Sequence, residues 1–263
     1  MDKNRLRKSL SLLNLLGFLA MIAVNYLAVA LPLNNKTTEE LSEQYPNLFV
    51  PAAITFSIWG VIYLLIAVFI VYQLIYAFGK NHPRKSFLEK IGLLFFISSI
   101  ANICWIFAWH YEIVYLSLLL MIILLGSLIA IYQRLRIGIS DALNSEKYLI
   151  HLPFSIYLGW ITIATIANTT ALLVYLDWGR FGLSEQFWTI VVISVGIVIS
   201  LAILFQRRDI FYCMVIDWAL LGIIIKRNTE GTVLFHNIIT ISYIGIALIS
   251  LGIITRLLSR KVY

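Results

Sequence analysis

The chain has 263 residues, of which 61% are hydrophobic, whereas soluble domains usually have roughly 45–50%. Its mean hydropathy is +0.91, and several apolar runs exceed the ~20 residues that cross a bilayer core. These values exclude an ordinary soluble domain and predict an all-α, polytopic transmembrane helical bundle. A transmembrane β-barrel is excluded because the sequence lacks segments of about ten residues with alternating polarity.

Eight apolar segments are expected to cross the membrane as helices. They cover about residues 10–31, 52–78, 88–109, 113–133, 150–175, 187–206, 209–225 and 234–256. The seventh is the shortest, and it either crosses the membrane or forms a tilted, partly re-entrant hairpin with the sixth. The first resembles a signal peptide, but its apolar run is longer than the usual ~7–15 residues, so we expect it to be retained as a helix.

The expected topology explains why the chain is rich in basic residues, with a net charge of +7, so no nucleic-acid partner is required. With the N-terminus in the cytoplasm, sixteen of the 20 Lys and Arg residues lie in inner segments. The outer segments carry the other four, which are Lys36, Arg180, Lys226 and Arg227. This asymmetry obeys the positive-inside rule and predicts that both termini are cytoplasmic. The inner basic residues are expected to face the anionic lipid leaflet.

The second span begins with an aromatic stretch at residues 49–63, which reads FVPAAITFSIWGVIY. Pro51 suits the first turn of a helix, where its missing N–H costs nothing. Four residues then follow at steps of three, four and seven, namely Phe56, Trp59, Gly60 and Tyr63. Because these steps place side chains on one helical face, the stretch predicts a helix that starts with an aromatic stripe.

The third and fifth spans carry similar stripes. The third has Asn102, Trp105 and Trp109, and the fifth has Tyr157, Trp160, Ala164 and Asn168. An unpaired amide in hydrocarbon is costly, so both asparagines are expected to face protein or a cavity. If the three stripes converge, they line a mostly apolar pocket that suits a flat hydrophobic ligand. The alternative is that they are packing surfaces that hold the bundle together.

Three motifs on these spans resemble those of the tryptophan-rich sensory protein family, also called translocator or peripheral benzodiazepine receptor proteins. In the second span, Pro51 precedes Trp59 by eight residues and Tyr63 follows it by four. The third span has Asn102-Ile-Cys-Trp105, and the fifth has Tyr157-Leu-Gly-Trp160 followed by Ala164-Thr-Ile-Ala-Asn168. The motifs occur in the family's order, and the resemblance covers about residues 10–178.

The resemblance implies a five-helix membrane core over residues 1–178, which leaves 179–263 as a three-helix extension. It implies a receptor, carrier or sensor that binds a tetrapyrrole- or sterol-like molecule through the residues of the three stripes, without catalytic residues or metal. A porphyrin-like ligand is then the expected bound group, and a homodimer is an open alternative. The expected location is the lipid bilayer, specifically the cytoplasmic membrane if the source is bacterial.

The chain departs from the family's motifs at several positions. Proline is replaced by Val50, Ser57 and Ile156, and tryptophan is replaced by Ala53 and Leu172. Family tryptophans are implicated in light-dependent porphyrin breakdown, so their loss argues against that enzymatic role. The ligand therefore need not be the family's usual one.

Asp217 is the clearest acidic residue inside a span, and intramembrane carboxylates are functional hypotheses by default. It supports an alternative function, a secondary transporter with Asp217 as the coupling acid. A third alternative is a non-catalytic regulatory membrane partner.

Four smaller expectations concern side chains near or inside the spans. Cys104 and Cys213 are expected to be buried thiols, because both lie in apolar runs. His110 is expected to be solvated in an outer turn. Gly196 and Ser200 form a pair of small residues that suits close contact with another helix.

Overall fold

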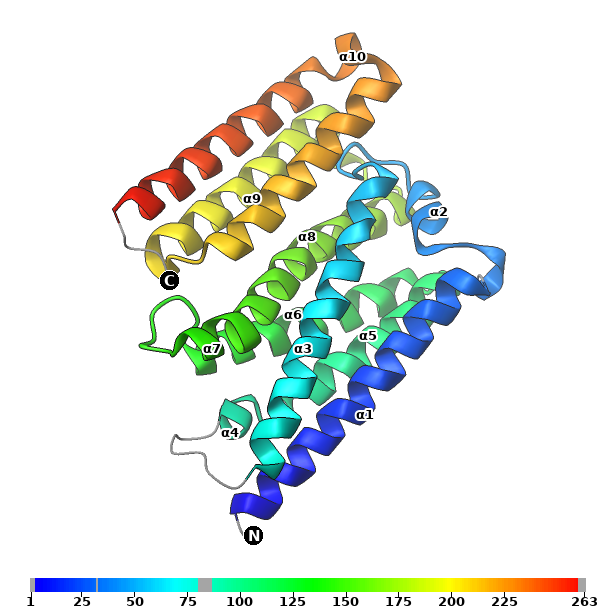
Figure 1. Ribbon diagram of the computed structural model, residues 1–263. Helices are drawn as coiled ribbons and strands as arrows, with labels where there is room; N and C mark the ends of the chain where they lie inside the picture. The colour runs from blue at the N-terminus through cyan, green and yellow to red at the C-terminus, as the bar shows by residue number, and fades with distance from the viewer. Residues whose placement is uncertain (1–2, 32, 80–86, 260–263) are drawn as a thin grey trace. The chain divides into compact units, whose positions relative to one another are not determined.

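The computed structural model describes residues 3–31, 33–79 and 87–259, and its helices are shown in Figure 1. Over these ranges the chain is helical and contains no strand, which confirms the prediction of an all-α bundle. Hydrocarbon offers no hydrogen-bond partners to the backbone, so a chain this apolar forms helices whose peptide groups bond internally. Within the described ranges, six helices are long and apolar enough to cross a membrane: Asn4–Ala30, Ala53–Phe78, Val114–Leu135, Asn144–Tyr175, Glu185–Arg207 and Val233–Leu258.

The two other expected spans also fall on helices. The third corresponds to α5 (Leu94–His110), which has 17 residues. The seventh is the first half of α10 (Ile210–Leu258), and it carries Asp217, Lys226 and Arg227. Helix α5 differs from the other six because it is shorter, and the first half of α10 differs because it carries more charged residues.

The chain divides into two compact units. The first comprises the described parts of Met1–Thr38 and Trp59–Leu158, and the second those of Glu39–Ile58 and Gly159–Tyr263. This division follows spatial contacts, whereas the expected division after residue 178 follows the family resemblance and stays a prediction.

The first unit is built on four long helices. They are α1 (Lys3–Ala30), α3 (Ile58–Phe78), α5 and α6 (Val114–Leu135). Shorter elements complete it: α4 (Phe87–Ile91), α7 (Asn144–Glu146), a π-helical turn at Lys147–His151 and the start of α8 (Leu152–Tyr175). Helix α5 lies against α1 and α6 (Figure 1). Gly17 permits the close contact with α5, because a Cβ there would lie 3.0 Å from Phe96 and 3.2 Å from Ser99.

A buried pair of amides joins α1 to α3. The Asn14 Nδ2 atom donates to Gln73 Oε1 at 2.9 Å, and Gln73 Nε2 donates to the Ser11 carbonyl at 3.3 Å. Both amide side chains are buried. Polar groups inside a bilayer need such partners, so this pair fixes which faces of α1 and α3 meet.

The second unit contains α2 (Thr38–Glu43), a 3₁₀ turn at Ala53–Ser57, most of α8, α9 (Glu185–Arg207) and α10. Helix α10 is broken at Gly231 (φ 126°) and Phe235, and it folds back on itself (Figure 1). Ser250 Oγ donates to Asp217 Oδ2 at 3.2 Å, which joins the two halves. The seventh and eighth expected spans are therefore the two arms of one helical hairpin.

Glycines on the second arm of α10 allow it to approach α9 closely. A Cβ at Gly245 would lie 2.5 Å from Ile197 Cδ1, and one at Gly252 would lie 2.7 Å from Leu204 Cδ2. Gly196 and Ser200, the small residues expected to seat another helix, are both buried. The Ser200 carbonyl accepts from Cys213 Sγ of α10 at 3.3 Å, whereas no described atom of another element lies within 4 Å of a Cβ placed on Gly196. Small residues therefore lie on both sides of the contact between α9 and α10, as is common in membrane bundles.

The start of the aromatic stretch packs against the first arm of α10. The Ala52 amide donates to the Gly222 carbonyl at 3.0 Å, and Trp218 Nε1 donates to the Thr55 carbonyl at 2.9 Å. The expected α-helical start is a 3₁₀ turn at Ala53–Ser57, and α3 begins at Ile58. The Thr55 carbonyl of the turn is satisfied by the Trp218 indole, which explains how a tight turn persists beside an apolar helix.

Charged groups hold the preceding loop to the turn of α10. Lys226 pairs with Glu43 at 2.7 Å, and Arg227 pairs with Glu230 at 2.5 Å. Arg227 also donates to the Val50 carbonyl at 3.4 Å. Burial lowers the pKa of the Arg227 guanidinium, although the Glu230 carboxylate opposes this shift. The backbone before Pro51 is therefore tied to α10 by both charge and hydrogen bonds.

We expect Gly222→Ala to destabilise the protein by about 1–3 kcal/mol, the usual cost of overpacking. The new Cβ would lie 2.0 Å from Thr55 Oγ1 and 2.9 Å from Pro51 Cβ, and neither atom ends a long flexible side chain. Gly196→Ala is the matched control, since its Cβ would meet no described atom within 4 Å. Thermal unfolding in detergent measures both, and equal midpoints for the two variants would contradict the close packing at Gly222.

Candidate functional site

The ten residues predicted to bind ligand are divided between the two units. The first unit contains Trp59, Tyr63, Asn102, Trp105, Trp109 and Tyr157, and the second contains Phe56, Trp160, Ala164 and Asn168. Their joint role as a binding site stays a prediction.

In the first unit, Trp59 brings together rings from α3 and α8. Its ring stacks on Tyr63 with centroids 5.5 Å apart and an interplanar angle of 21°. It meets Tyr157 edge-on at 6.1 Å. Trp59 and Tyr63 are four residues apart on α3, so the helix itself places them on one face. Such pairs contribute about 0.5–1.5 kcal/mol beyond their buried area.

Polar groups from α1 and α5 reach the same cluster. Asn25 Nδ2 donates to Asn102 Oδ1 at 2.7 Å, and the Tyr157 hydroxyl lies 3.9 Å from Met21 Sδ. The Asn102 side chain also lies beside the Tyr157 hydroxyl. Asn102 therefore faces protein, as the cost of an unpaired amide predicts. Asn25 was not among the residues predicted from the sequence, although an asparagine inside the first span is the same kind of signal as Asn102.

Among the described residues, several buried donors of the first unit have no hydrogen-bond acceptor, and two of them belong to aromatic side chains of the predicted stripes. These two are the Tyr63 hydroxyl and Trp105 Nε1. The Trp105 ring stacks on Trp109 at 6.1 Å, and Trp109 Nε1 donates to the Thr38 carbonyl at 3.3 Å. A buried unsatisfied donor costs about 1–3 kcal/mol, so these two atoms favour an acceptor supplied by a bound molecule.

In the second unit, Phe56 packs edge-on against Trp160 with centroids 5.9 Å apart. Phe56 comes from the 3₁₀ turn and Trp160 from α8. Asn168 is buried further along α8, and Ala164 is half-buried between them. The pair joins the start of the aromatic stretch to the predicted stripe of the fifth span.

Asp217 lies in the second unit, half-buried between the arms of α10. One carboxylate oxygen accepts the Ser250 bond described above. The other, Oδ1, is buried and has no hydrogen-bond donor among the described residues. Such an oxygen has an open acceptor position, which suits a proton or another cation.

A model of the TSPO-like protein family matches residues 11–255 of the chain. The chain belongs to this family. The match extends through α9 and both arms of α10, so it covers the helices that lie beyond the motif resemblance. No curated protein and no solved structure matches the chain.

Membership of the TSPO-like family, together with six apolar helices, makes this an integral multi-pass membrane protein. The family and the helical bundle support a binding-type role in the membrane. The resemblance found from Trp59, Asn102 and Trp160 is therefore confirmed at the level of the family.

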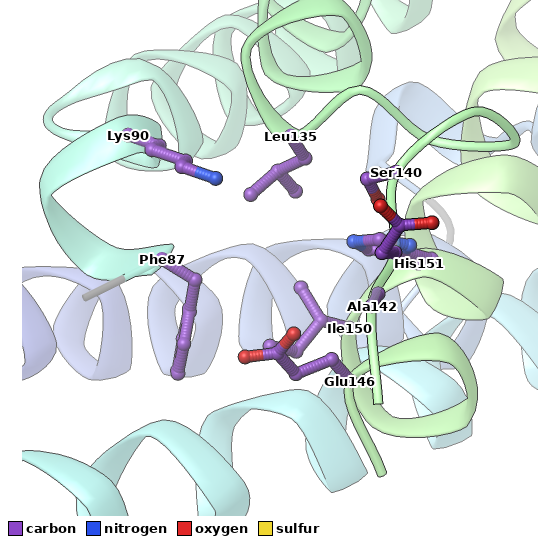
Figure 2. A pocket seen from close by; sticks show the side chains of 9 residues that line it. Phe87, Lys90, Leu135, Ser140, Ala142, Glu146, Ile150 and His151 are labelled. Atoms are coloured by element: carbon purple, nitrogen blue, oxygen red, sulfur yellow. The ribbon is translucent and has the colours of Figure 1, made fainter. Parts of the chain in front are cut away.

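The TSPO-like chain also has a polar pocket in its first unit, with a volume of about 330 Å³. Figure 2 shows Lys90 from α4 and Glu146 from α7 extending toward the space between them, and His151 and Ser140 also line the pocket. Asp141 completes the charged lining. Charged walls disfavour a flat hydrophobic molecule, so this pocket is unsuited to the ligand that the stripes predict.

Two smaller expectations are wrong. His110 is fully buried. Its Nδ1 atom hydrogen-bonds to the Ile106 carbonyl at 2.8 Å, and its backbone carbonyl accepts a hydrogen bond from Asn34 Nδ2 at 2.9 Å. Cys104 is exposed on α5, whereas Cys213 is buried as expected. An apolar run in a membrane helix includes faces that no protein covers, so it does not predict burial.

A double-mutant cycle tests the amide pair that links α1 to α5. Asn25→Ala and Asn102→Ala are each expected to lower stability, with a coupling energy of about 0.6 kcal/mol and at most about 1.7 kcal/mol. Unfolding by sodium dodecyl sulfate in mixed micelles measures the four free energies. Asn237→Ala, at an exposed position on α10, is the control. Strict additivity of Asn25→Ala and Asn102→Ala would show that the two amides do not interact.

Proposed function

We propose that the protein is a membrane receptor or carrier for a hydrophobic, tetrapyrrole- or sterol-like ligand, and that it acts by binding and not by catalysis. The main support for this proposal is the cluster around Trp59, where aromatic rings from α3 and α8 lie near amides from α1 and α5. Rings stack on a flat apolar ligand, and amides and hydroxyls bond to its polar edge. The same proposal places the protein in the cytoplasmic membrane if its source is a bacterium.

The partnerless donors support a ligand that carries acceptors. The Tyr63 hydroxyl and Trp105 Nε1 both donate hydrogen bonds, and carboxylate or carbonyl groups accept them. A tetrapyrrole with carboxylate side chains offers a flat body and acceptors in one molecule. Phe56 and Trp160, in the second unit, are proposed to contribute further aromatic surface.

Titration with protoporphyrin IX, followed by tryptophan fluorescence, tests this function. We expect saturable quenching in the wild-type protein, and binding that is about two- to tenfold weaker in Tyr63→Phe, the loss of one hydrogen bond. Tyr63→Phe removes a hydroxyl that has no partner in the protein, so the thermal midpoint without ligand should not fall.

Tyr148→Phe is the matched control, because Tyr148 belongs to the same unit and is exposed. It should leave both the affinity and the stability unchanged. Absence of quenching in the wild-type protein would exclude a porphyrin ligand. Equal affinities in Tyr63→Phe and the wild type would exclude the Tyr63 hydroxyl as a ligand contact.

The second candidate function is a secondary transporter with Asp217 as its coupling acid. It is supported by the buried Oδ1 oxygen that no described donor satisfies. Asp217→Asn keeps the size and the Ser250 contact but cannot carry a proton. In proteoliposomes with an imposed pH gradient, we expect this variant to lose proton-driven porphyrin uptake, while Asp141→Asn retains it. Unchanged uptake in Asp217→Asn would remove Asp217 from the mechanism.

A further inference from the structure

A second cavity, which we call the loop cavity, lies entirely within the second unit. It has a volume of about 330 Å³, within the range of small-molecule sites. Its walls come from the end of α8, the loop that follows, the start of α9 and residues 46–49. None of the ten residues of the predicted stripes lines it, so it is a separate place on the chain.

Most of the wall of the loop cavity is apolar and aromatic. Phe49, Leu173 and Val192 supply apolar surface, and Trp178 and Trp188 supply two indole rings. The ring centroids of the two indoles lie 5.1 Å apart, and Trp188 Nε1 donates to the Arg180 carbonyl at 2.9 Å. This bond holds the Trp188 ring in place, so the aromatic wall exists before any ligand arrives.

Three charged side chains line the loop cavity, and they leave an excess of negative charge. Arg180 and Glu185 pair with each other at 3.5 Å, and Glu185 also accepts the Leu48 amide at 3.0 Å. Asp177 is exposed, and no hydrogen bond or ion pair of its carboxylate occurs among the described residues. The one carboxylate not used by the protein therefore stands beside two indoles.

Aromatic faces and a carboxylate together form the usual recognition surface for an organic cation. The negative face of an indole attracts a cation within about 6 Å of the ring centroid, and quaternary ammonium groups are bound in this way. A neighbouring carboxylate adds Coulomb attraction, and the apolar wall accepts whatever group the cation carries. An anion or a neutral polar molecule gains neither attraction.

We propose that the loop cavity binds an organic cation, namely a quaternary ammonium or protonated amine attached to a small apolar group. Trp178 and Trp188 contact the cation, Asp177 neutralises it, and Phe49, Leu173 and Val192 cover the apolar group. The cation is either a soluble molecule or the choline head group of a membrane lipid, since both present the same chemistry. This site is independent of the proposed tetrapyrrole site.

Isothermal titration of the full chain in nanodiscs with benzyltrimethylammonium tests the proposal. Nanodiscs of uncharged digalactosyl diacylglycerol avoid both choline and surface charge. We expect saturable binding of the cation, with benzyl alcohol and benzoate at least tenfold weaker, because they share the ring and lack the positive charge. Benzyl alcohol or benzoate binding as tightly as the cation would overturn the proposal.

Variants then locate the site. We expect Trp178→Leu to weaken binding roughly tenfold, within the range of a cation–π contact, and Asp177→Asn to weaken it about two- to fivefold, as for an exposed charge. Asp177 has φ 48°, a left-handed conformation that asparagine tolerates, so this variant should fold. Asp141→Asn, an exposed acid of the first unit, is the control. Unchanged affinity in both Trp178→Leu and Asp177→Asn would exclude the loop cavity.

The choice of lipid in the nanodisc distinguishes a soluble cation from a lipid head group. In phosphatidylcholine nanodiscs, a lipid head group that fills the loop cavity should weaken benzyltrimethylammonium binding several-fold, and Asp177→Asn should reduce this difference. A soluble ligand predicts the same affinity in both lipids. If the indoles serve only to anchor the loop at the membrane interface, no saturable binding occurs in either lipid, and the proposal fails.

Discussion

A polar group inside the hydrocarbon is costly unless it finds a partner, and this constraint organises both units. Helices satisfy the backbone, so the remaining polar side chains decide which helical faces meet. In the first unit, Asn14 bonds to Gln73 and Asn25 bonds to Asn102, and both pairs begin on α1. In the second unit, Ser250 bonds to Asp217 and closes the hairpin of α10.

A few buried groups depart from this constraint, and the functional proposals rest on them. The Tyr63 hydroxyl, Trp105 Nε1 and Asp217 Oδ1 are buried, and the described residues offer them no partner. A protein that bound nothing would gain stability by replacing these groups with apolar ones. The two donors belong to the aromatic cluster of the first unit, and the acceptor belongs to the hairpin of the second. Binding and transport hypotheses therefore rest on different atoms in different units.

The first arm of α10 has a structural role at the start of the aromatic stretch. It bonds to the start of the aromatic stretch through the Gly222 carbonyl and Trp218 Nε1. The stretch that opens the second span therefore depends on a helix that lies 163 residues later in the chain, counted from Thr55 to Trp218. A match that continues to residue 255 is consistent with this dependence, because the C-terminal helices support a segment that carries a family motif.

The sequence by itself determined the class of fold and the family. Hydropathy predicted the helices, and spaced motifs on three spans predicted the family, because both depend on local order along the chain. Periodicity also predicted correctly that Trp59 and Tyr63 share a face. It did not predict the 3₁₀ turn at Ala53–Ser57, which depends on Trp218 from a distant helix.

Only the tertiary structure decided which faces are covered. Cys104 and His110 were both misjudged, one exposed and one fully buried. In a soluble protein, an apolar face must be covered by protein, so an apolar sequence predicts a buried face. In a membrane, lipid covers an apolar face equally well, so the same sequence does not predict burial. Helical spacing identifies the residues that lie together on a face, and only packing against Asn25, Gln73 or Ser250 determines where that face points.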